Sequence, residues 1–580
     1  MPRRVSAEGG APWRNRTEML GKNHNTERNE NMNQRMRQSS FRNTARILSI
    51  ALAVLLGGFL PGFGKGYAAP ITEAQALRAA VSWLERNPAP LEENTGQNVT
   101  DLISYADAQG NPLYYVALLS PRGFLILGGD DLMEPVIALV PEGTAYDPSG
   151  TNPLGALVTR DLARRGHVVR AIPKASRNLA ELETSNMAKW QALLEEQIPP
   201  EESLPSLADV RVAPLLQSTW SQESVNQEPC YNYYTPHGYP CGCVATAMAQ
   251  LMRFHEHPSR GIGARTFEIY IDEISEDRIT RGGNGLGGPY SWNAMVLQPG
   301  AAITEGQRQA IGALTYDAGL AVHMSYTSEG SGTDTLMAAD AFTETFGYSN
   351  AIKGYNGGDN FPEDPRNAAV LPNLDAGHPV LFGITGSEGG HAIVGDGYGY
   401  QGETLYHHLN MGWGGNSNAW YNLPNIDVEW MHGKNDEPMF SSVYKVVYNV
   451  FTEGTGEILS GRILDEEGNP FENVTITLSG PGLPSPRTAL TNSRGIYAFA
   501  KIPSGNTYTL RASAPGYLFS PSLRTEGVGT SENFGYSGNL WEVDFAGTPG
   551  NPSGGGGGGC SLGFLPGALA LLLPLVLFRK

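Results

Sequence analysis

The sequence predicts an α+β protein of several domains, and three patterns along the chain lead to this fold class. Residues 70–205 combine helical periodicity with strand-like runs. Residues 206–452 do so too, with the helices mainly first and the strands mainly after Val380. Residues 455–547 alternate apolar and polar side chains at period two, with turns between the runs, which predicts a small all-β sandwich.

The composition limits the classes of protein to which this chain can belong. A chain of 580 residues that is 40% hydrophobic can build several packed cores. Its formal net charge of −18 argues against a nucleic-acid-binding surface. Because there are only four cysteines in this length, we do not expect a disulfide scaffold.

The N-terminal region predicts export. Residues 1–35 are polar and read as disordered or as the product of an upstream start codon, whereas 36–69 have the pattern of a secretory signal peptide. A basic stretch precedes an apolar run over 47–60, and Gly66-Tyr67-Ala68-Ala69 offers small residues for cleavage. The alternative is a short N-terminal membrane anchor.

The C-terminal region predicts attachment to the cell surface. Residues 548–559 form a Gly-rich, flexible linker, and 560–580 hold Cys560, an apolar run and a basic end. The run is slightly short for a full span. The tail resembles Gly-rich bacterial C-terminal sorting signals, which implies a membrane segment that sorting machinery removes, with Cys560 as the processing or lipid-attachment point. The alternative is a plain tail anchor.

Cys243 lies where a nucleophilic cysteine would be placed. Gly242 is a loop residue, and from Val244 onward the side chains favour a helix, so Cys243 falls in its first turn. Unpaired N–H groups and partial positive charge at a helix start stabilise a thiolate and an adjacent oxyanion. The alternative is a buried structural cysteine, which is common for this residue type.

A cysteine nucleophile needs a histidine, and a third group to orient it. His391 follows two glycines and begins a β-type run, while Asn410 ends the next predicted strand, beside Trp413. The order Cys, His, Asn and their separations suit a cysteine peptidase. We therefore expect Asn410 to orient the His391 ring and Trp413 to shield that bond from water.

Together these motifs resemble the streptopain family of secreted cysteine peptidases, which have a papain-like fold of two lobes. The similar segments are Gly242-Cys243-Val244-Ala245-Thr246-Ala247, Gly389-Gly390-His391-Ala392 and Asn410-x-Gly412-Trp413-Gly414-Gly415. The resemblance implies that Cys243 is the nucleophile, His391 the general base and acid, and Gln222 an oxyanion donor. The chain also departs from the family in one place, since Met411 stands where the family usually has Trp.

The resemblance extends to residues 70–205, where Gly123 to Asp131 match the family's propeptide pattern. This implies an intramolecular inhibitor ahead of the peptidase domain; the alternative is an unrelated small domain. Residues 199–205 are Pro-rich and acidic and read as an exposed linker. We expect the mature enzyme to begin between about Leu204 and Arg211.

Two further cysteines allow other chemistry. Cys230 and Cys241 could pair in an oxidising compartment. A zinc site from these two, Cys243 and His237 has a spacing that fits no common site, so we expect no metal and no cofactor.

Residues 455–547 contain Thr491-x-x-x-Gly495-x-Tyr497-x-Phe499, which resembles carboxypeptidase regulatory-like and Cna-B-like modules. The sequence thus predicts a secreted, surface-anchored cysteine endopeptidase made as a zymogen, acting on protein or peptide substrates, with the β module as a spacer. The alternatives are a binding role for the module, a surface adhesin with an inactive peptidase-like domain, and a cysteine-dependent acyltransferase.

Overall fold

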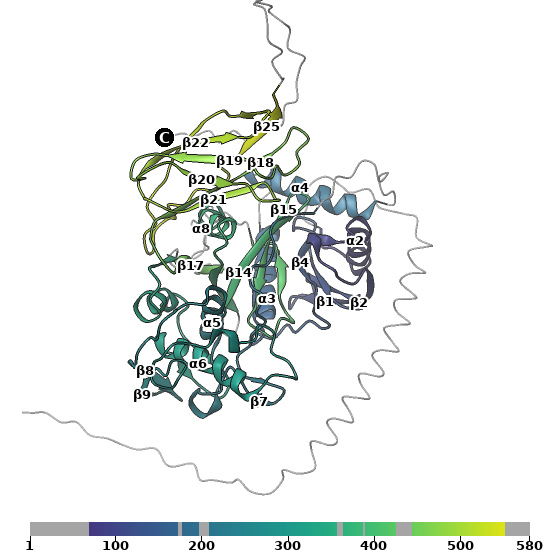
Figure 1. The fold of residues 1–580 in the computed structure, drawn as a ribbon. Coiled ribbons are helices and arrows are strands. Elements are labelled where there is room, and N and C mark those ends of the chain that lie inside the picture. Colours follow the sequence, from purple (N-terminus) through teal and green to yellow (C-terminus); the bar gives the residue numbers. More distant parts are fainter. Residues whose placement is uncertain are drawn as a thin grey trace, which may run out of the picture.

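The computed structural model describes residues 69–171, 177–195, 208–355, 363–386, 389–424 and 443–550. The expected signal peptide before Ala69, the C-terminal tail from 551 with Cys560, and the predicted linker at 199–205 lie outside these ranges. Figure 1 shows three units: an N-terminal unit of residues 69–195, a central unit of 208–451 and a β module of 457–549. No helix in the described ranges has both the length and the apolarity to cross a membrane.

The N-terminal unit is an antiparallel sheet covered on both faces. Its elements are α2 (Glu73–Arg86), the short 3-10 turn Pro90–Glu92, β1 (Asn98–Ala106), β2 (Pro112–Ser120), β3 (Phe124–Gly128), β4 (Val136–Val140), α3 (Pro153–Ala171) and α4 (Arg177–Leu194). Alternate strand residues face opposite sides. Tyr115 and Leu125 pack in one core with Trp83 of α2 and Trp190 of α4. Tyr114 and Ile126 pack in another core that includes the apolar side chains of α3.

The first half of the central unit carries the helices that the sequence predicts. Its elements are β5 (Ala208–Val212), β6 (Ser224–Val225), β7 (Glu228–Pro229), α5 (Cys243–His255), β8 (Thr266–Ile271), β9 (Ile274–Ile279), α6 (Glu305–Ala321), β10 (Ser325–Tyr326), β11 (Ser331–Gly332), α7 (Met337–Asp340) and a π-helical turn at Ala341–Thr345. The side chain of Thr304 caps α6 and forms a capping box with Gln307. The β8–β9 hairpin was not expected from the sequence, because the turn residues Asp272 and Glu273 adopt positive φ without a glycine.

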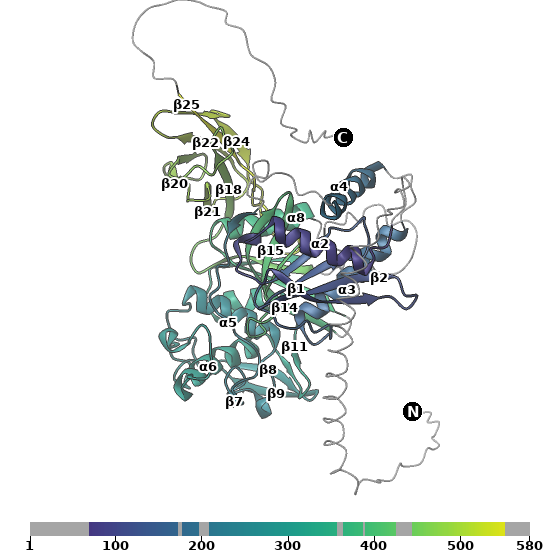
Figure 2. The same cartoon turned by 90° about the vertical axis from the view of Figure 1, so that its right-hand side faces the viewer.

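The second half of the central unit is rich in strands and joins the N-terminal sheet. It contains β12 (Asn350–Tyr355), α8 (Glu363–Asp375), β13 (Val380–Gly386), β14 (Gly389–Gln401), β15 (Thr404–Asn410), β16 (Ala419–Tyr421) and β17 (Val443–Phe451). One 11-stranded antiparallel sheet runs β1-β2-β3-β4-β16-β15-β14-β13-β17-β12, with β5 paired to β14. The two units meet where β4 pairs with β16. Figure 2 shows α2, β1 and β2 of the N-terminal unit lying against the central unit.

The contact between these units extends beyond the shared sheet. Arg165 of α3 is buried; it forms two hydrogen bonds to Asp161 and donates to the side-chain oxygen of Asn422 at 3.0 Å. The hydroxyl of Tyr421 donates to Asp161 at 2.7 Å. Charges this deeply buried are stable only when paired, and this ion pair lies within α3. The central unit adds a hydrogen bond to each member of the pair, and these bonds tie α3 to it.

The C-terminal module is a sandwich of two four-stranded sheets, as its alternation predicts. Its strands are β18 (Glu457–Leu464), β19 (Thr475–Ser479), β20 (Arg487–Leu490), β21 (Ile496–Ile502), β22 (Thr507–Ser513), β23 (Tyr517–Ser520), β24 (Arg524–Gly527) and β25 (Phe545–Pro549). The sheets have the orders β21-β18-β25-β23 and β20-β19-β22-β24.

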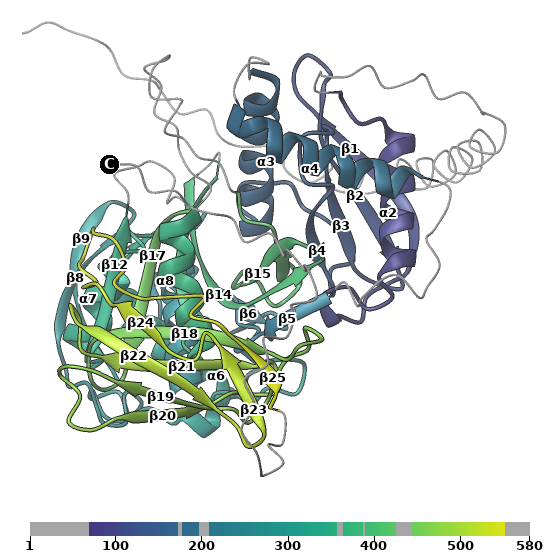
Figure 3. The ribbon, with the colours of Figure 1, turned by 90° about the horizontal axis from the view of Figure 1, so that it is seen from above.

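The module is docked on the central unit (Figure 3). Arg462 of β18, 8% exposed, forms two hydrogen bonds of 2.6 and 2.7 Å to Asp209 of β5. The hydroxyl of Ser460 donates to the buried carboxylate of Asp375 in α8 at 2.7 Å. Asn449 and Asn539 exchange side-chain hydrogen bonds in the buried junction between the two units.

Candidate active site

Helix α5 begins at Cys243, where the sequence predicts it. Gly242 precedes the helix with φ of +91°, a backbone region that favours glycine. A Cβ on Gly242 would come within 2.7 Å of Met324 Cε and 3.0 Å of the Ser331 carbonyl oxygen. The tight turn therefore requires glycine at this position, and it places the Cys243 sulfur at the start of a buried helix.

The environment of Cys243 favours its thiolate. Burial of the side chain, which is 8% exposed, by itself raises the pKa of the thiol. The hydrogen bond with His391, the charge of that ring and the N–H groups of Ala392 and Val244 lower it by more, so the pKa of Cys243 lies below its ordinary value. The sulfur is therefore primed as a nucleophile.

His391 reaches Cys243 from the opposite side of the site. It lies near the start of β14, which packs against α5, and its neighbour across the sheet is Ile384 of β13. Burial lowers the pKa of His391, but its hydrogen bond and charge interaction with Cys243 and its bond to the Gly150 carbonyl raise it above the ordinary value. The pair therefore favours a thiolate facing an imidazolium.

The N-terminal unit occupies this site through the loop before α3. The Nε2 atom of His391 lies 2.9 Å from the carbonyl oxygen of Gly150. Asn152 caps α3 by accepting from the N–H groups of Leu154 and Gly155, and its amide donates to Ser417 Oγ at 3.3 Å. The loop is thus anchored to α3 on one side and to the central unit on the other, with its carbonyl directed at His391.

The side chain of Asn410, expected to orient His391, is hydrogen-bonded to other groups in this structure. Its Oδ1 accepts from Gln250 Nε2 at 3.1 Å and from the N–H of Gly412 at 3.1 Å, and its Nδ2 donates to the carbonyl of Ser218 at 2.9 Å. Within the described residues no hydrogen bond joins Asn410 to His391. Its polar atoms instead tie the end of β15 to helix α5.

The other expected site residues take supporting places. Gln222 is 9% exposed, and its carbonyl accepts the N–H of Cys241 at 2.9 Å, which places it beside the turn before Cys243. Trp413 packs at the edge of the core that contains Tyr114, Ile126 and the apolar side chains of α3. Met411 is fully buried in that same core, at the position where the family that the sequence resembles usually has Trp. The larger ring of a Trp would need a different packing at Met411.

The suggested Cys230–Cys241 disulfide is not formed, since both residues are buried free thiols. The sulfur of Cys241 lies 3.3 Å from Thr246 Oγ1, and burial raises the pKa of each of these two cysteines to about 12. Among the residues that the structure describes, no group of three or more His, Cys, Asp or Glu side chains could hold a metal ion.

Gly150 and Asn152 were not among the site residues expected from the sequence. A usable signal was present, because Asn152 followed by Pro153 is a typical pairing of a helix cap and a first helical residue. That pairing predicts the start of α3, although it does not predict which loop carbonyl reaches His391.

Comparison with known protein families matches all three units. Residues 225–421 match the peptidase C10 family, residues 68–159 the Spi protease inhibitor, and residues 458–523 the carboxypeptidase regulatory-like domain.

Individual relatives agree with these matches. Streptopain of Streptococcus pyogenes serotype M1 is 30% identical over 190 residues, which cover 31% of this chain and 45% of streptopain. The thiol protease/hemagglutinin PrtT of Porphyromonas gingivalis is 25% identical over 370 residues, or 62% of this chain and 39% of PrtT. The chain thus spans less than half the length of either curated relative.

Two solved structures of Prevotella intermedia proteins are also similar. Active wild-type interpain A is 27% identical with a TM-score of 0.34, covering 44% of this chain and all of that one. A prointerpain A fragment is 20% identical with a TM-score of 0.43, covering 61% of this chain and 99% of that one.

Proposed function

Because the chain carries a peptidase C10 domain behind a Spi inhibitor-like propeptide domain, we propose that it is a cysteine endopeptidase made as an inactive precursor. The observation that carries the proposal is the pairing of Cys243, with its lowered pKa, and His391, with its raised pKa, at the meeting of α5 and β14. Its substrates are the peptide bonds of proteins.

The chemistry follows from these two residues. The Cys243 thiolate attacks the substrate carbonyl, and the N–H groups at the start of α5, together with the Gln222 side chain, stabilise the oxyanion. His391 then gives its proton to the leaving amine. Water, activated by the now neutral His391, hydrolyses the thioester, releases the acid product and restores the pair.

In the precursor, residues 69–195 act as an intramolecular inhibitor. The carbonyl of Gly150 accepts a hydrogen bond from His391 Nε2, so a backbone group of the N-terminal unit occupies one side of the catalytic imidazole. The shared β4–β16 edge and the hydrogen bonds of Arg165 to Asn422 and of Tyr421 to Asp161 hold the loop in the site. Activation then requires this unit to leave, after the chain between the units is cut.

The cut that starts the mature enzyme falls before Ala208 in our proposal. Strand β5 pairs with β14, and Asp209 is held by Arg462 of the β module. These contacts keep β5 with the enzyme after cleavage, so the cleavable bond belongs to the stretch 196–207. Of the starts expected from the sequence, Leu204 to Arg211, those after Ala208 are therefore left out of the proposal.

Secretion and surface anchoring complete the proposal, and their support is the sequence of residues 36–69 and 548–580. The C-terminal segment would be handed to sorting machinery and removed, with Cys560 at or near the processing point. Mass spectrometry of surface protein tests this. Loss of the peptide after Cys560 supports processing, whereas recovery of an intact Lys580 end argues against it.

The test of the enzymatic proposal is hydrolysis of fluorescently labelled casein after the stretch 196–207 has been cut. We expect wild type and Cys230→Ala to release fluorescent peptides, while Cys243→Ala and His391→Ala lose at least about 1,000-fold in rate, as removal of a nucleophile or its base does. If wild type releases no peptide either, the chain is a binding protein with an inactive peptidase-like domain.

A further inference from the structure

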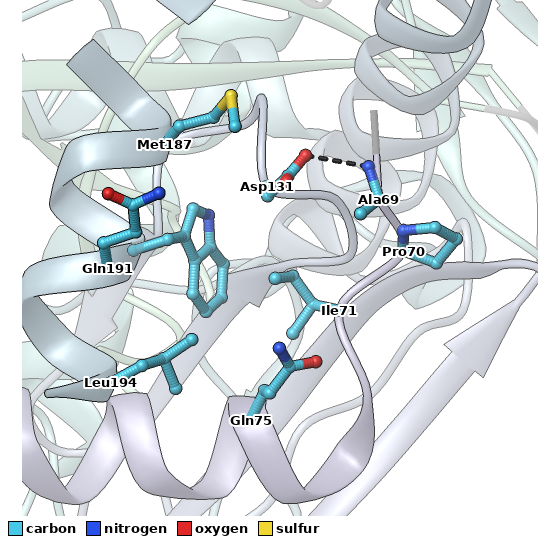
Figure 4. Close-up of a pocket in the computed structure, with 9 residues that line it drawn as sticks. Ala69, Pro70, Ile71, Gln75, Asp131, Met187, Gln191 and Leu194 are labelled. Atoms are coloured by element: carbon cyan, nitrogen blue, oxygen red, sulfur yellow. Dashed lines mark hydrogen bonds between the residues drawn. The ribbon is translucent and has the colours of Figure 1, made fainter. Parts of the chain in front are cut away.

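The first described residues of the chain lie in a site built around two neighbouring carboxylates. Ala69 to Ile71 run antiparallel to Gly129–Asp131, with Ile71 N–H donating to the Gly129 carbonyl at 3.0 Å and Asp131 N–H to the Ala69 carbonyl at 3.1 Å. The backbone nitrogen of Ala69 donates to Asp131 Oδ1 at 2.9 Å (Figure 4). A buried side-chain carboxylate thus faces the backbone nitrogen of Ala69.

The carboxylates of this site are short of positive charge. Asp130 is 0% and Asp131 6% exposed. Asp130 Oδ2 has no hydrogen-bond partner; its cation is Arg170, whose Nε is 3.5 Å away and whose guanidinium also lies 3.5 Å from Asp107. Burial, with the charge of Asp131 adding to it, raises the pKa of Asp130 to about 6, and burial also raises the pKa of Asp131. The Arg170 guanidinium therefore serves two carboxylates, Asp107 and Asp130, and no ion pair within the described residues reaches Asp131.

The surroundings of Ala69 would strengthen an ion pair. A pocket beside it has a volume of about 20 Å³, room for one water-sized group. Figure 4 shows Met187, Gln191 and Leu194 of α4 on one side and Ile71 and Gln75 on the other. A charge pair in such an apolar, enclosed place is screened far less than one on the surface.

The sequence before Ala69 supplies the reaction that would create such a charge. Gly66 and Ala68 are the small residues of an A-x-A-like signal-peptidase site, and cleavage by that pattern falls between Ala68 and Ala69, one residue before the end of the signal-peptide segment 36–69 expected from the sequence. Hydrolysis of this bond adds one water, leaves a carboxylate on Ala68 and frees the Ala69 amine, which takes up a proton at neutral pH. A neutral amide N–H becomes an ammonium group at the same place.

We propose that signal peptidase cuts the Ala68–Ala69 bond and that the new α-ammonium of Ala69 forms a partly buried salt bridge with Asp131. Arg170 is then left to Asp130 and Asp107, and the site gains the positive charge that it lacks. The salt bridge fixes the first residues to the end of β3, so the inhibitory unit reaches its full stability only after export. The inference rests on the proposed export and not on peptidase activity.

The test uses the whole chain carrying Cys243→Ala, so that self-cleavage plays no part. It is expressed with its own N-terminal region in an exporting bacterial host, alongside a variant with one glycine inserted between Ala68 and Ala69. In that variant cleavage after Ala68 leaves Ala69 with a neutral amide, although Asp131 is unchanged. Intact mass identifies each N-terminus, and thermal unfolding of the N-terminal unit is followed in both.

We expect the exported chain to begin at Ala69 and to unfold several degrees above the glycine variant. Asp131→Asn should abolish this difference in unfolding temperature. Glu85→Gln, which removes an exposed charge, is the control and should leave the difference unchanged. An N-terminus anywhere else, or no export at all, overturns the proposal. Equal unfolding temperatures of the exported chain and the glycine variant, both with Asp131 intact, would also overturn it. That last comparison needs no change at Asp131, so it stands even if Asp131→Asn fails to fold.

Discussion

The Nε2 atom of His391 lies 2.9 Å from the carbonyl oxygen of Gly150, so a backbone group of the N-terminal unit engages the proposed catalytic base. A carbonyl oxygen can only accept, so this contact favours the ring with a proton on Nε2 and contributes to its raised pKa. Inhibition in this arrangement acts on the imidazole rather than on the sulfur alone. The strength of the contact depends on how firmly the loop before α3 is held.

Weakening the contacts that hold the loop before α3 should speed activation of the precursor. Asn152→Ala removes the cap of α3 and the bond to Ser417, each worth about 1 kcal/mol. We therefore expect self-cleavage to begin about 5- to 30-fold faster, the factor that corresponds to 1–2 kcal/mol. A time course of intact mass measures it. The matched control is Thr151→Ala, an exposed neighbour; equal rates in the two variants would show that the Asn152 contacts do not restrain the loop.

The buried ion pair of α3 should matter far more than a surface pair. Arg165→Ala leaves Asp161 buried without its cation, which costs about 3–5 kcal/mol. Arg122→Ala breaks a pair with Glu142 whose side chains are 40% and 56% exposed, and costs at most about 1 kcal/mol. Calorimetry of the Cys243→Ala chain should show a large loss of stability for Arg165→Ala only; similar losses for both variants would mean that the buried pair stabilises the fold no more than the surface pair does.

The three described cysteines should differ in reactivity. The lowered pKa of Cys243 keeps its thiolate populated below the ordinary value of 9.0, whereas Cys230 and Cys241, at about 12, stay protonated. At about pH 7 iodoacetamide should therefore modify Cys243 alone in the activated enzyme. Fragment-ion mass spectrometry of the tryptic peptide that contains all three cysteines shows which of them is modified. Modification of Cys230 or Cys241 in the folded enzyme at a similar rate would be inconsistent with their burial.

The pKa shifts that Cys243 and His391 cause in each other should set the pH profile of the activated enzyme, in which Gly150 no longer contacts His391. The rate should rise as pH passes upward through the lowered pKa of Cys243, because the thiolate forms. It should fall as pH passes the raised pKa of His391, above 6.5, because the proton for the leaving amine is lost. Steady-state rates on a peptide substrate across pH check both limbs. A profile that only rises toward pH 9 would mean an ordinary thiol acting without an imidazolium.

Asn410 should prove structural rather than orienting. Asn410→Ala breaks bonds to Gln250, Gly412 and Ser218 and leaves buried partners unsatisfied, each at a cost of about 1–3 kcal/mol. We expect a lower Tm with both limbs of the pH profile unmoved. A shifted upper limb at unchanged Tm would instead place Asn410 beside His391 during catalysis.

Local signals predicted most of what lies close together in sequence. The switch from Gly242 to an apolar helix predicted the start of α5, and the period-two alternation predicted the sandwich of the β module. Cys243 and His391, which the fold brings together, could be predicted because a nucleophile and a base each lie in a recognisable local sequence.

Contacts between distant segments were not predictable in this way. Nothing in β4 or β16 alone shows that the two edges pair, because either strand could end a sheet. Asn410 seemed suited to orient His391 by its order in the chain, yet Gln250 and Gly412 take its oxygen. Which polar partner a side chain meets depends on packing, which spacing along the chain does not record.

The measurement to make first is the intact mass of the whole chain during incubation, for wild type and for Cys243→Ala side by side. We expect wild type to lose its N-terminal unit by a cut within 196–207, while Cys243→Ala stays whole. That result would tie the cleavage to the sulfur at the start of α5. If both proteins stay whole, or both are cut alike, Cys243 is not the nucleophile of a self-activating peptidase.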